Sequence, residues 1–351
     1  AVGAMMTASA WDRLAYLKAE NIATSSGTSL EGLKFQYRTV ASAEENEDAA
    51  WTEVVATAAD EKYTAFATGL TAETEYEYRL VNGSNEEIAT VQKFTTDKVD
   101  AKTALQNGGF EDWCTIQIPS ILGIGTIPTA YPNASESVSF WDTSNKGANS
   151  AYTVDPTNKV ETPINTVADP VGKYAATLKS QKVVIAFAAA SLYTGVFGEA
   201  DAASKTATLT FGQPFTSRPI ALHGYYQYAP VAIDNKDDAR LEAAGINISE
   251  GQMDECSIYI ALATKTYLID NGDPDTFINF EEDENIIAYG ALPSGAATNE
   301  TANNGYKEFT IPLQYKADKF GVQPTHIIVV CSASKYGDYM TGGAGSTLYV
   351  D

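Results

Sequence analysis

Short segments in which apolar and polar side chains alternate recur along most of the chain. The alternation is clearest in Leu33-Lys-Phe-Gln-Tyr-Arg38 and in Glu75-Tyr-Glu-Tyr-Arg-Leu-Val81, where Tyr76, Tyr78 and Leu80 share one side. A period of two residues places successive side chains on opposite faces of a β-strand, so each segment predicts a strand with one buried face. Since a half-buried strand needs a second layer to cover it, we predict an all-β chain built of sandwiches.

The length and composition of the chain fit two β-sandwich domains. A chain of 351 residues is longer than one ordinary domain, and its 20 tyrosines, 26 glycines and 13 prolines favour strands and turns over helices. The formal net charge of −22 disfavours nucleic acid and anionic membrane surfaces as partners, because both are bound through lysine and arginine. The sequence contains no apolar run of membrane-spanning length and no charged-then-apolar leader, so we expect neither a transmembrane segment nor an export signal in it.

Residues 1–97 have the strand spacing of one small sandwich. Within them, Leu70-Thr-Ala-Glu-Thr-Glu-Tyr76 resembles the tyrosine corner of a fibronectin type III module, in which the tyrosine hydroxyl bonds back to the backbone. Ala72 stands where that family usually has proline, and Phe94-Thr-Thr96 fits its last strand. The resemblance implies a fibronectin- or immunoglobulin-like spacer without a site of its own, followed by a polar linker over residues 98–106.

Six motifs follow one another between residue 107 and the end of the chain. Together they resemble the putative carbohydrate metabolism domain of surface and periplasmic proteins of Gram-negative gut bacteria. The resemblance covers residues 107–351 and implies a galactose-binding-like jelly roll with a role in glycan utilisation. It also implies a location at the cell surface, with a lipid anchor in the outer membrane, or in the periplasm. The motifs are Asn107-Gly-Gly-Phe-Glu-Asp-Trp113, Tyr131-Pro-Asn133, Phe140-Trp-Asp-Thr-Ser-Asn145, Tyr193-Thr-Gly-Val-Phe197, Arg218-Pro-Ile-Ala-Leu-His-Gly-Tyr-Tyr226 and Ser332-Ala-Ser-Lys-Tyr-Gly-Asp-Tyr-Met-Thr-Gly-Gly343.

Two carboxylates are candidates for a structural calcium site. In the related jelly rolls, a glutamate after a phenylalanine near the first strand and an aspartate in the last strand help to bind calcium. The resemblance assigns these roles to Glu111 and Asp351. Calcium takes six to eight oxygen ligands, which carboxylates and backbone carbonyls supply. The alternative is that both carboxylates are simply solvated at strand ends, and we expect the protein to require no other cofactor.

Aromatic rings beside hydrogen-bonding side chains are candidates for a sugar site. Sugars present apolar C–H faces that stack on exposed indole and phenol rings, whereas their hydroxyls need polar partners. The alternative is that these rings are core residues, since Trp and Tyr are mostly buried. We predict that a polysaccharide or oligosaccharide binds to loop residues of the second domain. The predicted carbohydrate-binding residues are Trp141, Asp142, Asn145, Tyr336, Asp338 and Tyr339.

Two other functions stay open at this point. A glycoside hydrolase needs a pair of carboxylates, for which Glu111, Asp142 and Asp338 are the candidates. Histidine-based hydrolysis is disfavoured because His223 and His326 lie in apolar strands, where we expect satisfied core residues. The third function is that of a cell-surface scaffold or adhesion protein, which would contact protein partners through the same loops.

Overall fold

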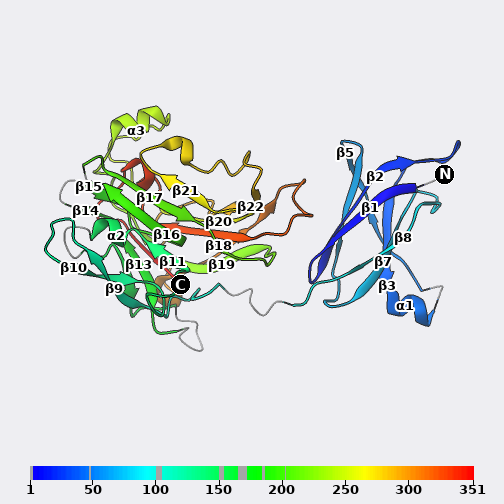
Figure 1. Ribbon diagram of the computed structural model, residues 1–351, viewed down its shortest axis with the longest axis horizontal. Helices are drawn as coiled ribbons and strands as arrows, with labels where there is room; N and C mark the ends of the chain where they lie inside the picture. The colour runs from blue at the N-terminus through cyan, green and yellow to red at the C-terminus, as the bar shows by residue number, and fades with distance from the viewer. Residues whose placement is uncertain are drawn as a thin grey trace. The chain divides into compact units, whose positions relative to one another are not determined.

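The computed structural model describes residues 3–46, 49–99, 105–149, 154–164, 172–183, 186–201 and 203–351 (Figure 1). Strands make up 47% of the structure and helices 8%, so the protein is all-β, as predicted. The chain forms two compact units. Unit 1 contains Ala1–Thr103 and Ala317–Val322, and unit 2 contains Ala104–Lys316 and Gln323–Asp351. None of the helices in the described ranges is long and apolar enough to cross a membrane.

Unit 1 contains two four-stranded antiparallel sheets. A short helix, α1 (Val40–Glu45), directly follows the strand that ends at Thr39. It is capped by the side chain of Thr39, which accepts a hydrogen bond from the backbone N–H of Ser42. The first sheet has the order β1 (Gly3–Ala10), β2 (Leu14–Ala23), β6 (Lys62–Thr68), β5 (Thr57–Ala59), and the second has the order β4 (Thr52–Val55), β3 (Lys34–Thr39), β7 (Glu75–Val81), β8 (Glu87–Thr95).

The alternation seen in the sequence decides which side chains of unit 1 form its core. Phe35 of β3 pairs with Leu80 of β7, and both are fully buried. Tyr76 of β7 is also buried, and its ring stacks on Phe94 of β8 at 5.5 Å. The predicted strands around Phe35 and Tyr78 are therefore confirmed, and their apolar faces meet the buried face of β2 in one hydrophobic cluster.

A tyrosine hydroxyl fixes the corner that leads into β7. The hydroxyl oxygen of Tyr76 accepts the backbone N–H of Thr71 at 2.9 Å, which confirms the predicted bond back to the backbone. The hydroxyl of Thr96 donates to the carbonyl of Thr71 at 2.7 Å and accepts the N–H of Thr74 at 2.9 Å. The corner is therefore held by one side chain of β7 and by one that directly follows β8.

Changing Tyr76 to Phe should lower the free energy of unfolding of unit 1 by about 1 kcal/mol, because the part-buried Thr71 N–H loses its acceptor. Urea unfolding followed by tyrosine fluorescence measures the change. Tyr63→Phe, on the half-buried surface of β6, is the matched control and should change stability by less than about 0.5 kcal/mol. Equal effects of the two substitutions would contradict the assigned role of the corner.

Unit 2 is a sandwich of a nine-stranded and a five-stranded antiparallel sheet, with two additional two-stranded ribbons. The larger sheet has the order β21 (Tyr267–Asp270), β17 (Thr206–Phe211), β16 (Ser191–Asp201), β25 (His326–Ser332), β20 (Ser257–Ala263), β22 (Ile286–Ala291), β24 (Gln314–Tyr315), with β11 (Trp141–Thr143) paired to β16 and β18 (Gln213–Pro214) paired to β25. The smaller sheet has the order β12 (Thr157–Val160), β13 (Ala175–Lys179), β26 (Thr347–Val350), β19 (Ala221–Ala229), β23 (Lys307–Pro312). The ribbons pair β9 (Cys114–Pro119) with β10 (Thr126–Tyr131) and β14 (Gln181–Val183) with β15 (Ala186–Ala188).

Short helices lie in the connections of unit 2. They are α2 (Asn145–Ala148), α3 (Asp238–Ala243) and the 3₁₀ turns η1 (Pro274–Thr276), η2 (Asn303–Gly305) and η3 (Gly337–Tyr339).

The nine-stranded sheet is partly covered on both faces. On its inner face, Ile258 lines a small internal hollow together with Val350 of the five-stranded sheet. Its outer face carries Tyr259 and is covered by Phe277 and Phe280, which come from the segment after β21. This covering segment, residues 271–285, forms a partial third layer over the outer face.

Candidate functional site

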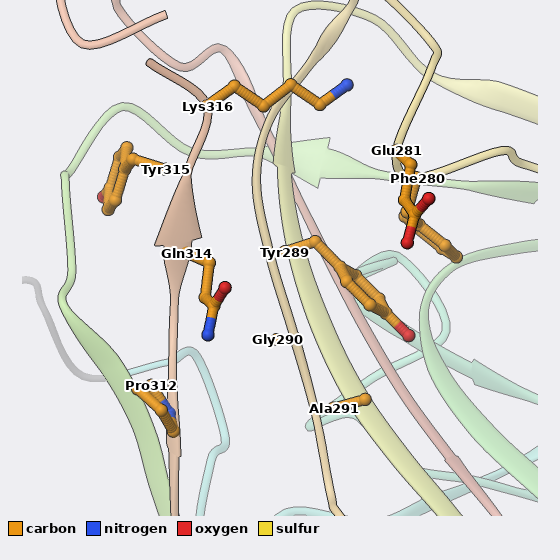
Figure 2. A pocket seen from close by; sticks show the side chains of 9 residues that line it. All are labelled: Phe280, Glu281, Tyr289, Gly290, Ala291, Pro312, Gln314, Tyr315 and Lys316. Carbon is orange, nitrogen blue, oxygen red and sulfur yellow. The ribbon is translucent and has the colours of Figure 1, made fainter.

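A pocket of about 480 Å³ lies on the outer face of the nine-stranded sheet, where β22 and the edge strand β24 meet the covering segment. This volume is in the range of small-molecule binding sites. Figure 2 shows the nine residues that line it, and they come from three separate parts of unit 2. They are Phe280, Glu281, Tyr289, Gly290, Ala291, Pro312, Gln314, Tyr315 and Lys316.

Two stacked rings form one wall of the pocket. Phe280 of the covering segment and Tyr289 of β22 lie 4.3 Å apart between ring centroids, with an angle of 16° between their planes. Tyr259 of β20 packs edge-on against Phe280 at 5.4 Å. Burial raises the pKa of the Tyr289 phenol, so the hydroxyl stays protonated over the neutral pH range. The wall is therefore an apolar surface with a neutral polar edge.

Polar side chains surround the stacked rings. Gln314 of β24 pairs with Tyr289 across the strands, and paired residues point to the same face of a sheet. The Glu281 side chain is exposed next to Phe280. The ammonium group of Lys316 donates to the backbone carbonyl of Asp283 at 2.7 Å, so this side chain links the end of β24 to the covering segment (Figure 2). The pocket thus offers an amide, a carboxylate and an ammonium group beside the rings.

A tight turn holds Phe280 and Glu281 in place. Asn279 accepts the backbone N–H groups of Glu281 and Glu282 with its side-chain oxygen, at 3.2 and 3.1 Å. The N–H of Asp283 donates to the carbonyl of Asn279 at 2.9 Å. Asparagine side chains stabilise turns in this way, so Asn279-Phe-Glu-Glu-Asp283 presents its aromatic residue in a fixed position.

Two of the predicted sugar-binding residues lie in the interior of unit 2. Trp141 is 1% exposed, donates from its indole nitrogen to the carbonyl of Gln106 at 2.7 Å and packs against Phe110. Asn145 is 0% exposed, and its side-chain amide bonds both the carbonyl and the N–H of Thr157. The prediction that they belong to an exposed loop is wrong, because these side chains satisfy buried backbone groups instead.

Asp142, predicted as a sugar ligand and as a candidate catalytic acid, is also buried. Its carboxylate accepts the ammonium group of Lys146 at 2.6 Å and the N–H groups of Phe197 at 2.8 Å and Thr143 at 2.9 Å. It thereby ties β11 to α2 and to β16. All of these contacts are internal, so the prediction of a ligand-facing carboxylate is wrong and the role of Asp142 is structural.

Changing Asp142 to Ala should lower the stability of unit 2 by about 2–4 kcal/mol, because it leaves one buried and one part-buried N–H group and an ammonium group without their acceptor. Chemical unfolding monitored by circular dichroism measures the loss. Asp112→Ala removes an exposed carboxylate and should change stability by less than about 0.5 kcal/mol. A wild-type melting curve for Asp142→Ala would contradict the structural role.

The other three predicted residues lie in or next to the η3 turn, directly after β25. Asp338 is exposed, and Tyr336 and Tyr339 are half-buried. The ring of Tyr339 contacts Phe277 of the covering segment at 5.7 Å. Burial and, to a smaller extent, the nearby charge of Asp338 raise the pKa of Tyr259. The η3 turn therefore lies beside the same aromatic face as the pocket.

A buried carboxylate anchors the segment that contains the η3 turn. Asp254 is 1% exposed and accepts the hydroxyl of Ser334 at 2.7 Å and the N–H of Gly343 at 2.8 Å, at the two ends of the segment. The sequence offered no signal for this role, because Asp254 and its partners are 80 and 89 residues apart.

The two candidate calcium ligands, Glu111 and Asp351, are close enough for the charge of one to raise the pKa of the other. Both oxygens of Glu111 accept the N–H of Lys173, at 2.8 and 2.9 Å, and Oδ2 of Asp351 accepts the N–H of Ile164 at 2.7 Å. Burial, together with the negative charge of Glu111, raises the pKa of Asp351 to about 6. Across the part of the chain that the structure describes, no three His, Cys, Asp or Glu side chains gather as a metal site. A cation here would need backbone oxygens in addition to the two carboxylates.

The two histidines differ in their exposure and in their hydrogen-bond partners. His223 has a side chain that is 51% exposed, and its Nε2 lies 2.8 Å from Oε1 of Glu308, so the prediction that it is a core residue is wrong. His326 is half-buried, its Nδ1 lies 2.8 Å from the Thr325 hydroxyl, and burial lowers its pKa. The apolar pattern of a strand does not show which of its two faces is covered in the folded protein.

The pocket residues were missed by the sequence analysis. Tyr289 lies in an apolar strand, Ile286-Ile-Ala-Tyr289, which is typical of core, and Gln314 and Lys316 lie next to a strand of only two residues. The one available signal was the aromatic residue of Asn279-Phe-Glu-Glu-Asp283, which stands alone within a polar turn.

The model of one protein family, described as a putative carbohydrate metabolism domain, matches residues 109–351. The match covers most of the chain, so the protein belongs to this family. Membership means that the chain has a carbohydrate-related role.

Solved structures with a similar arrangement include two that are described as putative glycoside hydrolases. The one from Bacteroides vulgatus is 23% identical, covers 69% of this chain and 94% of its own, and has a TM-score of 0.45. The one from Bacteroides thetaiotaomicron is 17% identical, covers 94% of this chain and 97% of its own, and has a TM-score of 0.44. A carbohydrate-binding module in complex with β-1,4-galactotriose is 10% identical, covers 60% of this chain and 83% of its own, and has a TM-score of 0.23. A search of curated proteins gave no match.

Proposed function

We propose that this protein binds a glycan, as a polysaccharide or oligosaccharide, in the pocket at the edge of the nine-stranded sheet. The observation that carries the proposal is the fixed Phe280–Tyr289 wall beside Glu281, Gln314 and Lys316. The C–H face of a sugar ring packs on such a wall, and the polar groups bond its hydroxyls. Binding sites combine apolar surface and a few convergent polar groups in this way.

The carboxylates of unit 2 favour binding over hydrolysis as the proposal. A glycosidase positions two carboxyl groups about 5–10 Å apart on either side of the scissile bond. Among the nine described residues that line the pocket, Glu281 is the only carboxylate. Of the three carboxylates considered for catalysis, Asp142 is used by Lys146 and Glu111 by the backbone of Lys173. The third, Asp338, does not line the pocket.

The charge around the pocket favours an uncharged glycan. Glu281 begins a run of four acidic residues that ends at Glu284. The ammonium group of Lys316 is bonded to the Asp283 carbonyl, and Lys265 lies 3.9 Å from the Asp283 carboxylate. Uronate or sulfate groups would therefore meet a negative rim, in a chain whose net charge is already −22.

The proposal extends to the rest of the chain and to its location. Unit 1 acts as a fibronectin type III-like spacer, which the Tyr76 corner and the pair of four-stranded sheets support. The protein acts at the cell surface or in the periplasm, where extracellular glycans are met. Fractionation of the host cell tests the location, and recovery in the cytosol would contradict it.

Changing Tyr289 to Ala should weaken glycan binding about tenfold or more, because it removes half of the stacked wall. Affinity gels and calorimetry with neutral xyloglucan, galactan, mannan and β-glucan measure the effect, with polygalacturonate and heparin as anionic probes. Tyr225→Ala, a half-buried tyrosine of β19 outside the pocket, is the matched control and should bind like wild type.

Three results would contradict the binding proposal. They are no retention of the wild-type protein on any neutral glycan, equal binding by Tyr289→Ala and Tyr225→Ala, and release of reducing sugar that is abolished in Glu281→Gln. The last result would identify a hydrolase.

A structural calcium ion between Glu111 and Asp351 is a separate part of the proposal. The raised pKa of Asp351, to which the negative charge of Glu111 contributes, supports this site, because a cation between the two carboxylates would relieve their repulsion. Oδ1 of Asp351 lies beside Gly109, where a Cβ would come within 3.9 Å of it.

Changing Asp351 to Asn should raise the melting temperature at pH 8 in the presence of a chelator and leave it unchanged at pH 4. Asp351 holds its proton more tightly in the folded protein, at a pKa of about 6, than at its ordinary value of 3.8. Its stabilising contribution is thus full below about pH 4 and is lost as the pH rises through 6.

Calcium should raise the melting temperature of the wild-type protein and of the control Asp112→Asn, whose carboxylate is exposed, and should not raise that of Asp351→Asn. Scanning fluorimetry with calcium and with chelator measures both effects. An identical wild-type curve in the two conditions would remove the calcium site from the proposal.

A further inference from the structure

The turn that joins β9 to β10 exposes three large aliphatic side chains. Ile121, Leu122 and Ile124 are 57%, 54% and 72% exposed. The backbone N–H of Ser120 donates to the carbonyl of Gly125 at 2.9 Å, so these side chains fill three of the four positions inside the closed turn. Tight turns more often contain glycine, proline, asparagine, aspartate or serine. Single exposed apolar residues are ordinary, whereas a contiguous group such as this apolar tip, residues 121–124, marks an interaction site.

The apolar tip is held in a defined shape. The N–H of Gly123 donates to the carbonyl of Ser120 at 3.1 Å, and the N–H of Leu122 donates to the hydroxyl of Ser120 at 3.2 Å. Directly behind the tip, Ile127 of β10 is buried, which anchors the ribbon to the rest of unit 2. Backbone N–H groups of the turn are thus bonded within it, and this lowers the free-energy cost of moving the turn out of water.

The ribbon that carries the apolar tip is free of charged side chains. No Asp, Glu, Lys or Arg occurs between Asp112 and Glu136, and this is the longest uncharged stretch of a chain whose net charge is −22. Two polar side chains of the ribbon pair with each other, because the hydroxyl of Thr126 donates to the side-chain oxygen of Gln117 at 3.0 Å. A charged group would have to lose its water on entering an apolar layer, so the composition of the ribbon suits such a layer.

The size and the edges of the ribbon disfavour a second copy of this chain as the partner. A stable dimer buries about 800 Å² on each molecule, and three partly exposed aliphatic side chains offer far less. Pro119 of β9 and Pro128 of β10 lack the N–H groups that an added strand would need. A lipid layer requires neither a large area nor a complementary shape, because its acyl chains rearrange around apolar side chains that enter by about 5–10 Å.

We propose that the apolar tip inserts into the surface of a membrane whose lipids carry no net charge. The three aliphatic side chains lie at the boundary between headgroups and acyl chains, and the rest of unit 2 stays in water. The net charge of −22 opposes binding to anionic lipids, so zwitterionic lipids are the favoured class. The inference does not depend on the glycan site, because the described pocket lining contains no residue of the tip.

Vesicle flotation with the full chain tests the proposal. Phosphatidylcholine vesicles should carry the wild-type protein, and replacing part of the lipid by phosphatidylglycerol should weaken binding. The double variant Leu122→Ser, Ile124→Ser should bind phosphatidylcholine at least about tenfold more weakly. The matched control is Ile220→Ser, Leu268→Ser, which removes two side chains of unit 2 that are 69% and 64% exposed outside the tip, and it should bind like wild type.

Two single variants complete the experiment. Leu122→Trp should be quenched by brominated phosphatidylcholine well beyond the wild-type protein, whose four tryptophans provide the baseline. Ile124→Asp places one charge at the tip and should also weaken binding at least about tenfold, which repeats the test if the double variant fails to fold.

Loss of flotation in the tip variants alone, together with quenching of Leu122→Trp, supports insertion of the tip. Three results overturn it: no flotation of the wild-type protein with phosphatidylcholine, equal flotation of the tip and control double variants, or stronger binding to the anionic vesicles. Self-association that the tip variant abolishes, without any vesicle binding, overturns it in favour of a second copy of the chain.

Discussion

The outer face of the nine-stranded sheet has to be covered, and the arrangement of unit 2 follows from this requirement. Tyr259 and its neighbours present apolar surface away from the five-stranded sheet, so the face cannot be left to water. The covering segment, residues 271–285, supplies Phe277 and Phe280 for this purpose. Between the covering segment, β22 and β24 a hollow is left, and this hollow is the pocket.

The fold of both units was largely predictable because it depends on local patterns. Alternation in β3 and β7 specified their buried faces, and the Leu70–Tyr76 motif specified a hydrogen bond that the structure contains. Each of these signals is contained in a segment of about seven residues. The motifs after residue 107 similarly indicated the family to which the chain belongs.

The site was much less predictable, because it depends on which face of a strand is left uncovered. Trp141 and Asp142 combine an aromatic and an acidic residue, as a sugar site does, yet both satisfy interior backbone groups. Tyr289 has the local pattern of a core residue, and it borders a pocket only because the covering segment ends beside it. Sequence spacing carries no information on which part of a sheet face residues 271–285 cover, or on where the edge strand β24 lies.

The shortness of the edge strand β24 has a consequence for how the protein behaves at high concentration. Gln314 and Tyr315 pair with β22, the N–H of Lys316 donates to the Ile287 carbonyl, and the Lys316 side chain is committed to the Asp283 carbonyl. Sheet edges of this kind offer almost no backbone ladder to a second molecule, and a lysine at the edge discourages strand addition further. An open aromatic surface can therefore lie at the margin of a large sheet without turning that margin into a site of self-association.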